Sequence, residues 1–265
     1  MQENLILRDL AIKSVVEACT FLETINFGYT TVEKKSSESD LVTEIDRRIE
    51  KVIVDFLRGE RGSDSFLGEE GSTVTGSSEI KWVIDPIDGT TNFVYGIPGF
   101  GVSVAAEKNG EIIAGAVADP VHNEIYDAAK GFGSRCNGNK INVRRGNKIE
   151  SALIATGFSY STERREVQSK ILTQLLPKIG DIRRFGAAAV DLCWVANGRV
   201  DAFYEEGLNY WDYAAGSLIA LEAGATVQQL PDFLGETLLV AVSPEIEMDF
   251  LAFLERACNQ IVEDS

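Results

Sequence analysis

The stretch from Trp82 to Phe93 constrains the fold of this chain more than any other part of its sequence. It opens with an apolar run of the length of a buried strand and ends in Gly-Thr-Thr-Asn, which favours a tight turn into a helix. Asp85 falls where the strand is expected to end, and Asp88 follows three residues later. Because Pro86 fixes the backbone between them, both carboxylates can turn toward one point.

Two carboxylates directed at one point suit a hard cation. Mg²⁺ prefers oxygen ligands and keeps open positions for the oxygens of a phosphate. If Gly89, Thr90 and Thr91 begin a helix, their backbone N–H groups could hold a phosphate beside that ion. The same short fragment is equally typical of a polar turn, so it does not decide the function by itself.

The charge balance narrows the possible partners. The chain has 265 residues, 45% of them hydrophobic, which is enough for a sizeable core and excludes a disordered protein. Its formal net charge of -16 argues against nucleic acid or an anionic membrane as a partner. A phosphate site lined by acidic side chains repels its ligand unless cations lie between them. A phosphatase of this composition is therefore expected to be a metalloenzyme.

Cysteine usage and the N-terminal residues indicate the compartment. No Cys-x-x-Cys pair occurs among the four cysteines, as expected for free thiols in a reducing environment. The first residues lack the basic and then apolar profile of a signal peptide, and no apolar run has the length of a membrane span. We therefore expect a cytoplasmic protein without a membrane partner.

Hydrophobic periodicity predicts two helices before the central stretch. The first spans about residues 4–27, and a polar, mobile loop over 33–39 separates it from a second helix that ends at Leu57. Thr43 is the expected N-cap of the second helix, with Asp46 completing a capping box. This capping role accounts for Asp46 without any function.

The remaining pattern predicts two sheets packed among helices. Asn109 and Gly110 lie between two apolar strands and are typical of a type I′ hairpin turn, which indicates an antiparallel sheet. Beyond about residue 150 strands and helices alternate, without internal repeats or a flexible linker. We expect an α+β half over 1–150, with the antiparallel sheet and most candidate metal ligands, followed by an α/β half over 151–265.

Three further acidic residues are candidates for the same site. Glu69 ends a short predicted strand, while Asp46 and Asp212 each lie at a predicted helix start. Acidic residues favour helix starts for electrostatic reasons unrelated to metals, so none of the three is decisive alone. Spacing along the chain does not show whether they converge on Asp85 and Asp88.

Four motifs, taken in order, indicate a family. They are Asp40-Leu-Val-Thr-x-x-Asp46, Gly68-Glu69-Glu70, the stretch Trp82 to Phe93, and Tyr210-Trp211-Asp212-Tyr-Ala-Ala-Gly216. Together they resemble the inositol monophosphatase family of Mg²⁺-dependent, lithium-sensitive phosphatases, from the first helix to about Gly224. The resemblance implies a layered αβαβα sandwich of the inositol monophosphatase and fructose-1,6-bisphosphatase type, and a homodimer.

The resemblance also implies roles for individual residues. The implied ligands, for two or three Mg²⁺ per site or Mn²⁺ as a substitute, are Glu69, Asp85, the carbonyl of Ile87, Asp88 and Asp212. Thr90, hydrogen bonded to Asp46, would activate the attacking water together with Glu69. The implied substrate contacts are Asp88, Gly89, Thr90, Gly186, Ala187, Ala188, Glu205 and Asp212.

Other implied positions are less specific. Arg183 lies in an Ile-Arg-Arg motif of bacterial members and is a candidate substrate contact. A surface or subunit-contact role is the equal alternative for Arg183, and the same holds for Arg184. Lys35 and Asp40 match residues of the mobile loop that approaches the site in this family.

The chemistry of phosphate ester hydrolysis agrees with these assignments. The reaction requires charge neutralised on the phosphoryl oxygens, a water placed in line and the leaving alkoxide stabilised. Cations held by Asp85 and Glu69 can meet the first two requirements, and a cation held by Asp88 and Asp212 the third. No protein nucleophile is then required.

Two competing chemistries use other residues. Cys193 and Arg199 have the spacing of cysteine-dependent phosphatases, but apolar neighbours surround Cys193 in the middle of a predicted helix. A serine-histidine triad or a histidine-rich metal site would have to use His122, the single histidine, which we expect in a solvent-facing loop.

Hydrolysis of a small phosphorylated polyol, myo-inositol 1-phosphate first, is the expected function. Thr91 favours inositol phosphatases over histidinol-phosphate phosphatases, where lysine is expected at this position, and fructose-1,6-bisphosphatase is the next alternative. A non-catalytic metal-binding regulator of the same fold is the alternative of another class. The segment after Ala225 is shorter than in most members of the family, which bears on substrate preference and surface contacts.

Overall fold

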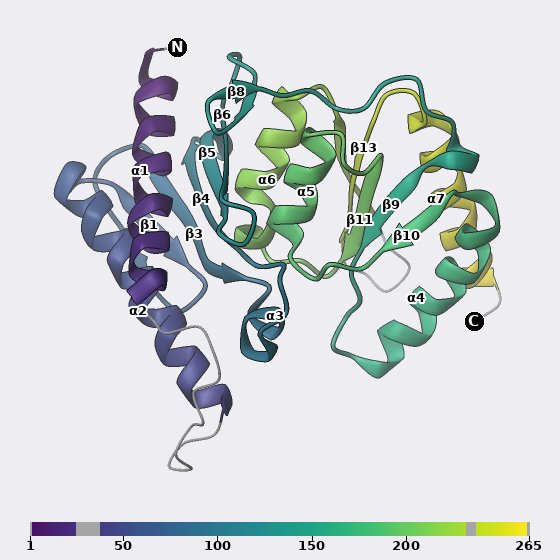
Figure 1. Ribbon diagram of the computed structural model, residues 1–265, viewed down its shortest axis with the longest axis horizontal. Coiled ribbons are helices and arrows are strands. Elements are labelled where there is room, and N and C mark those ends of the chain that lie inside the picture. Colours follow the sequence, from purple (N-terminus) through teal and green to yellow (C-terminus); the bar gives the residue numbers. More distant parts are fainter. Residues whose placement is uncertain (1, 25–37, 232–236, 264–265) are drawn as a thin grey trace.

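Helices and sheets stack in five layers (Figure 1). The computed structural model describes residues 2–24, 38–231 and 237–263, and for 38–43, 231 and 258–263 it describes the backbone only. The helices are α1 (Gln2–Thr24), α2 (Glu38–Glu60), α3 (Thr90–Tyr95), α4 (Thr162–Leu175), α5 (Ala188–Ala196), α6 (Tyr210–Glu222) and α7 (Glu247–Glu263), with 3₁₀ turns at Ile149–Ser151 and Leu176–Lys178.

The first sheet is formed by the strands that precede residue 150. They are β1 (Ser65–Gly68), β2 (Thr73–Val74), β3 (Ile80–Asp88), β4 (Gly101–Lys108), β5 (Glu111–Asp119), β6 (Glu124–Ala129), β7 (Ser134–Cys136) and β8 (Asn139–Lys140). Their order is β2-β1-β3-β4-β5-β6-β7-β8. Only β1 and β3 run parallel, and the other neighbouring pairs are antiparallel.

The second sheet is formed by the strands of the later half. They are β9 (Leu153–Thr156), β10 (Asp181–Arg183), β11 (Ala202–Glu206), β12 (Thr226–Pro231) and β13 (Thr237–Val242), in the order β10-β9-β11-β13-β12. The strands β10, β9 and β11 are parallel to one another, whereas β13 is antiparallel to both of its neighbours. The connection 232–236 lies outside the described residues.

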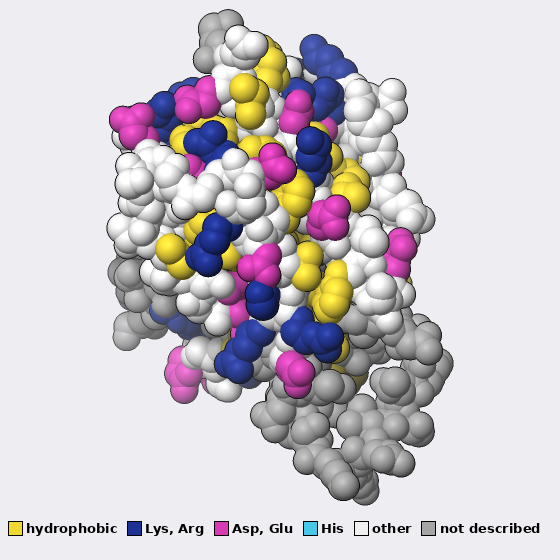
Figure 2. Space-filling view, turned by 90° about the vertical axis from the view of Figure 1, so that its left-hand side faces the viewer, with side chains coloured by type: hydrophobic (Ala, Val, Ile, Leu, Met, Phe, Trp, Pro, Cys, Tyr) yellow, Lys and Arg dark blue, Asp and Glu magenta, His cyan; other side chains and the backbone are white. Residues whose placement is uncertain are grey.

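The outer pair α1 and α2 covers one face of the first sheet. Apolar residues of α1 recur at helical spacing and are buried against the strands; they are Leu7, Leu10, Ala11, Val15, Ala18 and Leu22. The opposite faces of both helices meet solvent. There, basic, acidic and apolar side chains are interspersed without one large apolar patch (Figure 2).

The middle pair α5 and α6 lies between the two sheets and joins them. Almost every side chain of α5 is buried, as expected for a helix covered on all sides. Gly216 of α6 allows the two helices to approach closely, since a Cβ atom there would lie 2.8 Å from the Cβ of Leu192. One apolar core therefore includes residues of both sheets and both helices.

The remaining pair, α4 and α7, covers the outer face of the second sheet around a third apolar core. The layer order is thus α1 and α2, first sheet, α5 and α6, second sheet, α4 and α7, which confirms the predicted αβαβα sandwich. Within the described residues no helix has both the length and the apolar character required to cross a membrane.

The type I′ turn predicted between β4 and β5 is confirmed. Asn109 and Gly110 have φ angles of 55° and 81°, which such a turn requires. The division at about residue 150 falls between the two sheets, but α5 and α6 pack against strands of both. That the two halves are separate domains stays a prediction.

Two predicted boundaries near the site were wrong. The strand β3 does not end at Asp85 but continues to Asp88, because it remains paired with β4. The helix α2 begins at Glu38, so Thr43 lies inside the helix and is not its N-cap. Acidic residues at 38 and 40 suit the first turn of a helix and explain the earlier start. Lys35 lies outside the described residues, and Asp40 is described by its backbone only.

Candidate active site

The pairing of β3 with β4 brings the two central carboxylates to one face of the first sheet. Asp85 pairs with Ser103 and Asp88 with Gly101, so two residues, Pro86 among them, lie opposite a single residue of β4. Residues three apart in a regular strand point to opposite faces, and the extra residue of a β-bulge reverses this. Proline lacks the N–H that a regular ladder would use. The sequence thus produces the convergence that it predicted, but through a bulge.

Asp88 binds the beginning of helix α5. Its Oδ1 accepts the backbone N–H of Ala188 at 3.0 Å, and its Oδ2 accepts those of Ala189 at 2.7 Å and Val190 at 3.3 Å. The residue before the helix, Ala187, supplies no side-chain cap. The carboxylate therefore satisfies donors that would otherwise be orphaned, and the positive end of the helix dipole holds it in place.

Asp212 is oriented by the start of helix α6. Its Oδ2 accepts the backbone N–H of Asn209 at 2.7 Å, and the side chain of Asn209 caps the N–H of Asp212 in return. Burial raises the pKa of Asp212 to about 6, and the hydrogen bonds from Asn209 oppose that rise. The capping role foreseen for helix-start acids is real, yet it also fixes the direction of this carboxylate.

Glu69 lies beside Asp85 because β1 runs parallel to β3. Gly68 pairs with Ile84, and the backbone N–H of Glu69 donates to the carbonyl of Ile84 at 3.2 Å. The side chain of Glu69 lies at the exposed rim of the site, close enough to the carboxyl group of Asp85 for each to affect the other's pKa. Two segments of the first sheet thus present carboxylates side by side.

The acidic side chains raise one another's pKa. Burial and repulsion by Asp88 and Glu69 hold the pKa of Asp85 well above its usual range. Burial and repulsion by Asp212 do the same for Asp88, against the hydrogen bonds from α5. Partial burial raises the pKa of Glu69 to about 7, and Asp212 adds to the rise. Glu69, Asp85, Asp88 and Asp212 therefore lie in one region, as the family resemblance implied.

Asp46 approaches this region from helix α2. It is 4% exposed, and its Oδ1 is buried without a hydrogen-bond partner in the described part of the chain. Burial, then repulsion by Glu70 and Glu69, raises its pKa to about 8. The expected hydrogen bond from Thr90 is absent, because the Thr90 hydroxyl donates to the carbonyl of Ile87 at 2.9 Å.

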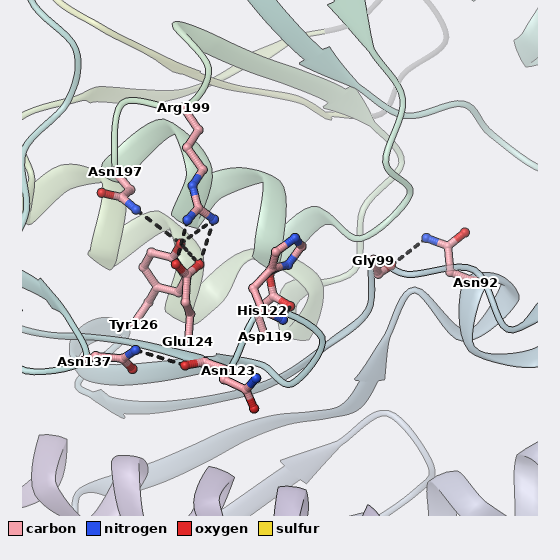
Figure 3. Close-up of polar contacts among 10 residues, drawn as sticks. All are labelled: Asn92, Gly99, Asp119, His122, Asn123, Glu124, Tyr126, Asn137, Asn197 and Arg199. Carbon is pink, nitrogen blue, oxygen red and sulfur yellow. Dashed lines mark hydrogen bonds and ion pairs between the residues drawn. The ribbon is translucent and has the colours of Figure 1, made fainter. Parts of the chain in front are cut away.

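The turn at Gly89 packs against the predicted substrate segment. Gly89 has φ of 86°, and a Cβ atom there would lie 3.0 Å from both the Ala187 Cβ and the Gly186 carbonyl oxygen. Asn92 holds the same junction: its amide donates to the carbonyl of Gly99, as Figure 3 shows, and to that of Phe185, both at 2.6 Å. Segments from the two halves of the chain therefore meet at this turn.

Glu205 is the penultimate residue of strand β11 and lies on the second-sheet side of the site. Burial raises its pKa to about 7, Arg184 opposes this rise, and Asp212 adds to it. Gly157 makes room for the side chain, since a Cβ atom there would lie 2.0 Å from the Glu205 carboxyl carbon. Arg184, one of the two arginines of the Ile-Arg-Arg motif, therefore faces Glu205.

The other arginine of that motif has a different partner. The Arg183 guanidinium donates to Asp181 at 2.6 Å on the exposed side of β10. Its predicted contact with a substrate stays a prediction, and the arginine that faces the acidic residues is Arg184.

Two buried acidic residues near the site were not predicted from the sequence. Asp191 lies in α5, and neither of its carboxylate oxygens has a hydrogen-bond partner within the described residues. Glu50 follows Asp46 by one helical turn and is 2% exposed. The sequence contains two signals of these residues. One is a single aspartate in the otherwise apolar helix α5, and the other is a pair of acids on the buried stripe of α2.

Neither competing chemistry is supported. Burial in α5 raises the pKa of the Cys193 thiol well above its usual value, so it is no reactive nucleophile. His122 is more engaged than expected: its Nδ1 lies 2.8 Å from buried Asp119 (Figure 3), and its ring packs edge-on against Trp194. These contacts give the partly exposed imidazole a structural role.

The donor set fits a hard divalent cation. Its members are carboxylate oxygens and the Ile87 carbonyl, and one buried oxygen of Asp85 has no hydrogen-bond partner among the described residues. In the arrangement described, however, no three acidic, histidine or cysteine side chains within those residues are close enough to ligate one ion together. Ion binding would therefore require movement of these side chains.

Comparison with known proteins agrees with this geometry. Residues 7–253 match the model of the inositol monophosphatase family. An inositol-1-monophosphatase of Mycobacterium leprae is 46% identical over 242 residues, which cover 86% of this chain and 83% of that protein. A Pseudomonas aeruginosa protein called Nus factor SuhB is 42% identical over 211 residues, covering 77% and 76%.

A solved structure shows the same fold. Mycobacterium tuberculosis SuhB superposes with a TM-score of 0.80 at 37% identity, over 97% of this chain and 96% of that one. The layered fold is that of a phosphatase family. This chain belongs to the inositol monophosphatase family.

Proposed function

We propose that this protein is a Mg²⁺-dependent phosphomonoesterase that hydrolyses myo-inositol 1-phosphate to inositol and phosphate. The observation that carries the proposal is the meeting of Glu69, Asp85, Asp88 and Asp212 in one region, placed there by the strand β1, the bulge in β3 and the start of α6. Membership of the family and the name of the Mycobacterium leprae relative support the substrate.

The chain's own residues arrange the reaction. The N–H groups of α5 and the capping box of α6 orient Asp88 and Asp212, so these ligands are held before anything binds. Two or three Mg²⁺ ions, or Mn²⁺ in their place, would be held by Glu69, Asp85, Asp88, Asp212 and the carbonyl of Ile87. When bound, these ions would neutralise negative charge on the phosphoryl oxygens and activate a water.

Substrate orientation falls to the second half of the chain. Glu205 and the segment Gly186–Ala188 border the acidic group and would accept and donate hydrogen bonds to the hydroxyls of a polyol. Asp46 lies near Glu69, where the attacking water would be positioned with the help of the Thr90 hydroxyl. The phosphate would rest at Gly89 and Thr90.

The test is phosphate release from three substrates. Purified protein with millimolar Mg²⁺ is expected to prefer myo-inositol 1-phosphate over histidinol phosphate and fructose 1,6-bisphosphate. Chelation of the metal should abolish release, and Li⁺ should inhibit it. A preference for histidinol phosphate by orders of magnitude would overturn the substrate, and full activity in excess chelator would overturn the metal mechanism.

Two associations belong to the same proposal. Family resemblance supports a homodimer, which light scattering would measure directly. The absence of a nucleic-acid partner rests on the net charge alone, and relatives named Nus factor SuhB leave a non-catalytic role as the second candidate. A biological role retained by an inactive, folded Asp88→Asn protein would favour that second candidate.

A further inference from the structure

Glu50 is a buried acid that the proposed reaction does not use. It lies on α2, one helical turn after Asp46, and is 2% exposed. No ion pair links it to a lysine or arginine in the part of the chain that the structure describes. A buried carboxylate is costly to keep unless nearby donors compensate its lost hydration.

The compensating donors belong to the turn that carries Glu69. The Oε2 of Glu50 accepts the backbone N–H of Glu70 at 2.8 Å, and its Oε1 accepts that of Ser72 at 2.9 Å. The same turn is closed by the N–H of Gly68, which donates to the carbonyl of Ser72 at 3.1 Å. The carboxylate therefore binds the inner side of the turn from two directions.

The peptide groups on both sides of the Glu69 Cα are consequently held by hydrogen bonds. The N–H of Glu69 itself donates to the carbonyl of Ile84 on β3, at 3.2 Å. The N–H after it, on Glu70, donates to Glu50. Because both flanking peptide planes are held, the direction in which the Glu69 side chain leaves the backbone is set by β3 and by Glu50 together.

Gly68 gives independent evidence that the turn is built around this carboxylate. A Cβ atom at position 68 would lie 2.2 Å from the Oε2 of Glu50 and 2.4 Å from its carboxyl carbon. The backbone of Gly68 has no positive φ, so its conformation does not require glycine. The missing side chain is explained by the room that Glu50 occupies.

We infer that Glu50 is a positioning residue for the metal ligand Glu69. Its carboxylate holds the turn after β1 so that the Glu69 side chain stays beside Asp85, while the same helix brings Asp46 to the site. The inference rests on the proposed function and adds to it a residue that contacts neither the ion nor the substrate. Its loss should weaken Mg²⁺ binding more than substrate binding.

The test compares Glu50→Gln with Asp64→Asn. Asp64 is also a buried acid at 1% exposure, but it lies at the opposite end of β1, where it accepts from Ser78, the indole of Trp82 and the guanidinium of Arg61. Both changes remove one buried charge and keep the shape of the side chain. Asp64→Asn therefore controls for a purely structural loss.

Two measurements are made on each protein, the thermal midpoint against Mg²⁺ concentration and the steady-state kinetics at several Mg²⁺ concentrations. For Glu50→Gln we expect the half-saturating Mg²⁺ concentration to rise by roughly 10- to 100-fold in both. The KM for substrate at saturating Mg²⁺ should change little. Asp64→Asn should lower the metal-free midpoint and leave the half-saturating concentration unchanged.

Gly68→Ala serves as a second route to the same displacement, since it pushes the carboxylate away without removing it. It should reproduce the weaker Mg²⁺ response and decides the matter if Glu50→Gln does not fold. A half-saturating Mg²⁺ concentration within a factor of about two of the wild type in the folded variant would overturn the inference. A wild type that neither hydrolyses substrate nor responds to Mg²⁺ would overturn the proposed function instead.

Discussion

Replacing Asp88 by asparagine separates its two functions, which are capping α5 and binding a cation. In the metal-free protein its carboxylate accepts N–H groups from Ala188, Ala189 and Val190. An amide keeps one accepting oxygen but turns its NH₂ group toward the N–H that the other oxygen accepted, so the cap loses about 1–3 kcal/mol. The change also removes repulsion from Asp212, which opposes that loss.

The two effects should nearly cancel without metal. A net change within about 1 kcal/mol corresponds to a shift of the thermal midpoint of roughly 2–4 °C or less for a chain of this size. With Mg²⁺ the outcome differs. At a concentration 100 times the dissociation constant, the wild type gains about 2.7 kcal/mol, or roughly 5–11 °C. Asp88→Asn should gain little and should lose turnover.

Differential scanning calorimetry with and without Mg²⁺ measures both quantities. Asp55→Asn is the matched control, since Asp55 pairs with Lys51 on the exposed face of α2 and undergoes the same change of charge. It should keep the full Mg²⁺ response. An Asp88→Asn protein stabilised by Mg²⁺ as strongly as the wild type would refute the role of this carboxylate as a ligand.

Three more outcomes follow from the geometry. Without metal, the free energy of unfolding should fall as pH rises from about 4 to 8. The reason is that Asp46 (pKa about 8) and Glu69 (pKa about 7) bind their protons more tightly in the folded protein than in the unfolded chain. Chemical denaturation at a series of pH values measures this fall. Asp191→Asn should raise the thermal midpoint by roughly 2–10 °C at pH 7.5 and by less at pH 4, because it removes a buried carboxylate that has no hydrogen-bond partner within the described residues. An unchanged midpoint at pH 7.5 would contradict this. Gly89→Ala should cost about 1–3 kcal/mol in urea unfolding, because φ is 86° there and the new methyl group would crowd Ala187.

Local rules predicted the parts of the site that lie close together in the chain. The spacing of Asp85 and Asp88 around Pro86 was sufficient to predict that their carboxylates converge. It was not sufficient to predict how, because a β-bulge depends on the partner strand β4, whose register no local pattern reveals. The helix start at Thr43 failed for the opposite reason, since a strong local cap signal was overridden by the continuation of the helix to Glu38.

Long-range contacts could be reached only through resemblance. Asp88 meets α5 across 100 residues of chain, and no periodicity relates the two. The implied bond between Thr90 and Asp46 shows the limit of that route, because the hydroxyl binds the nearer carbonyl of Ile87 in this structure. Resemblance named acidic residues that the structure brings into one region, and their roles as ligands stay a prediction.

The middle helices have a consequence for how the protein could be divided. Asp88 precedes the connection between β8 and β9, and the helix that holds its carboxylate follows it. A chain cut in that connection would yield two fragments, neither of which contains both the carboxylate and its anchoring amides. Turnover by a mixture of the fragments would then report their reassociation without any added label.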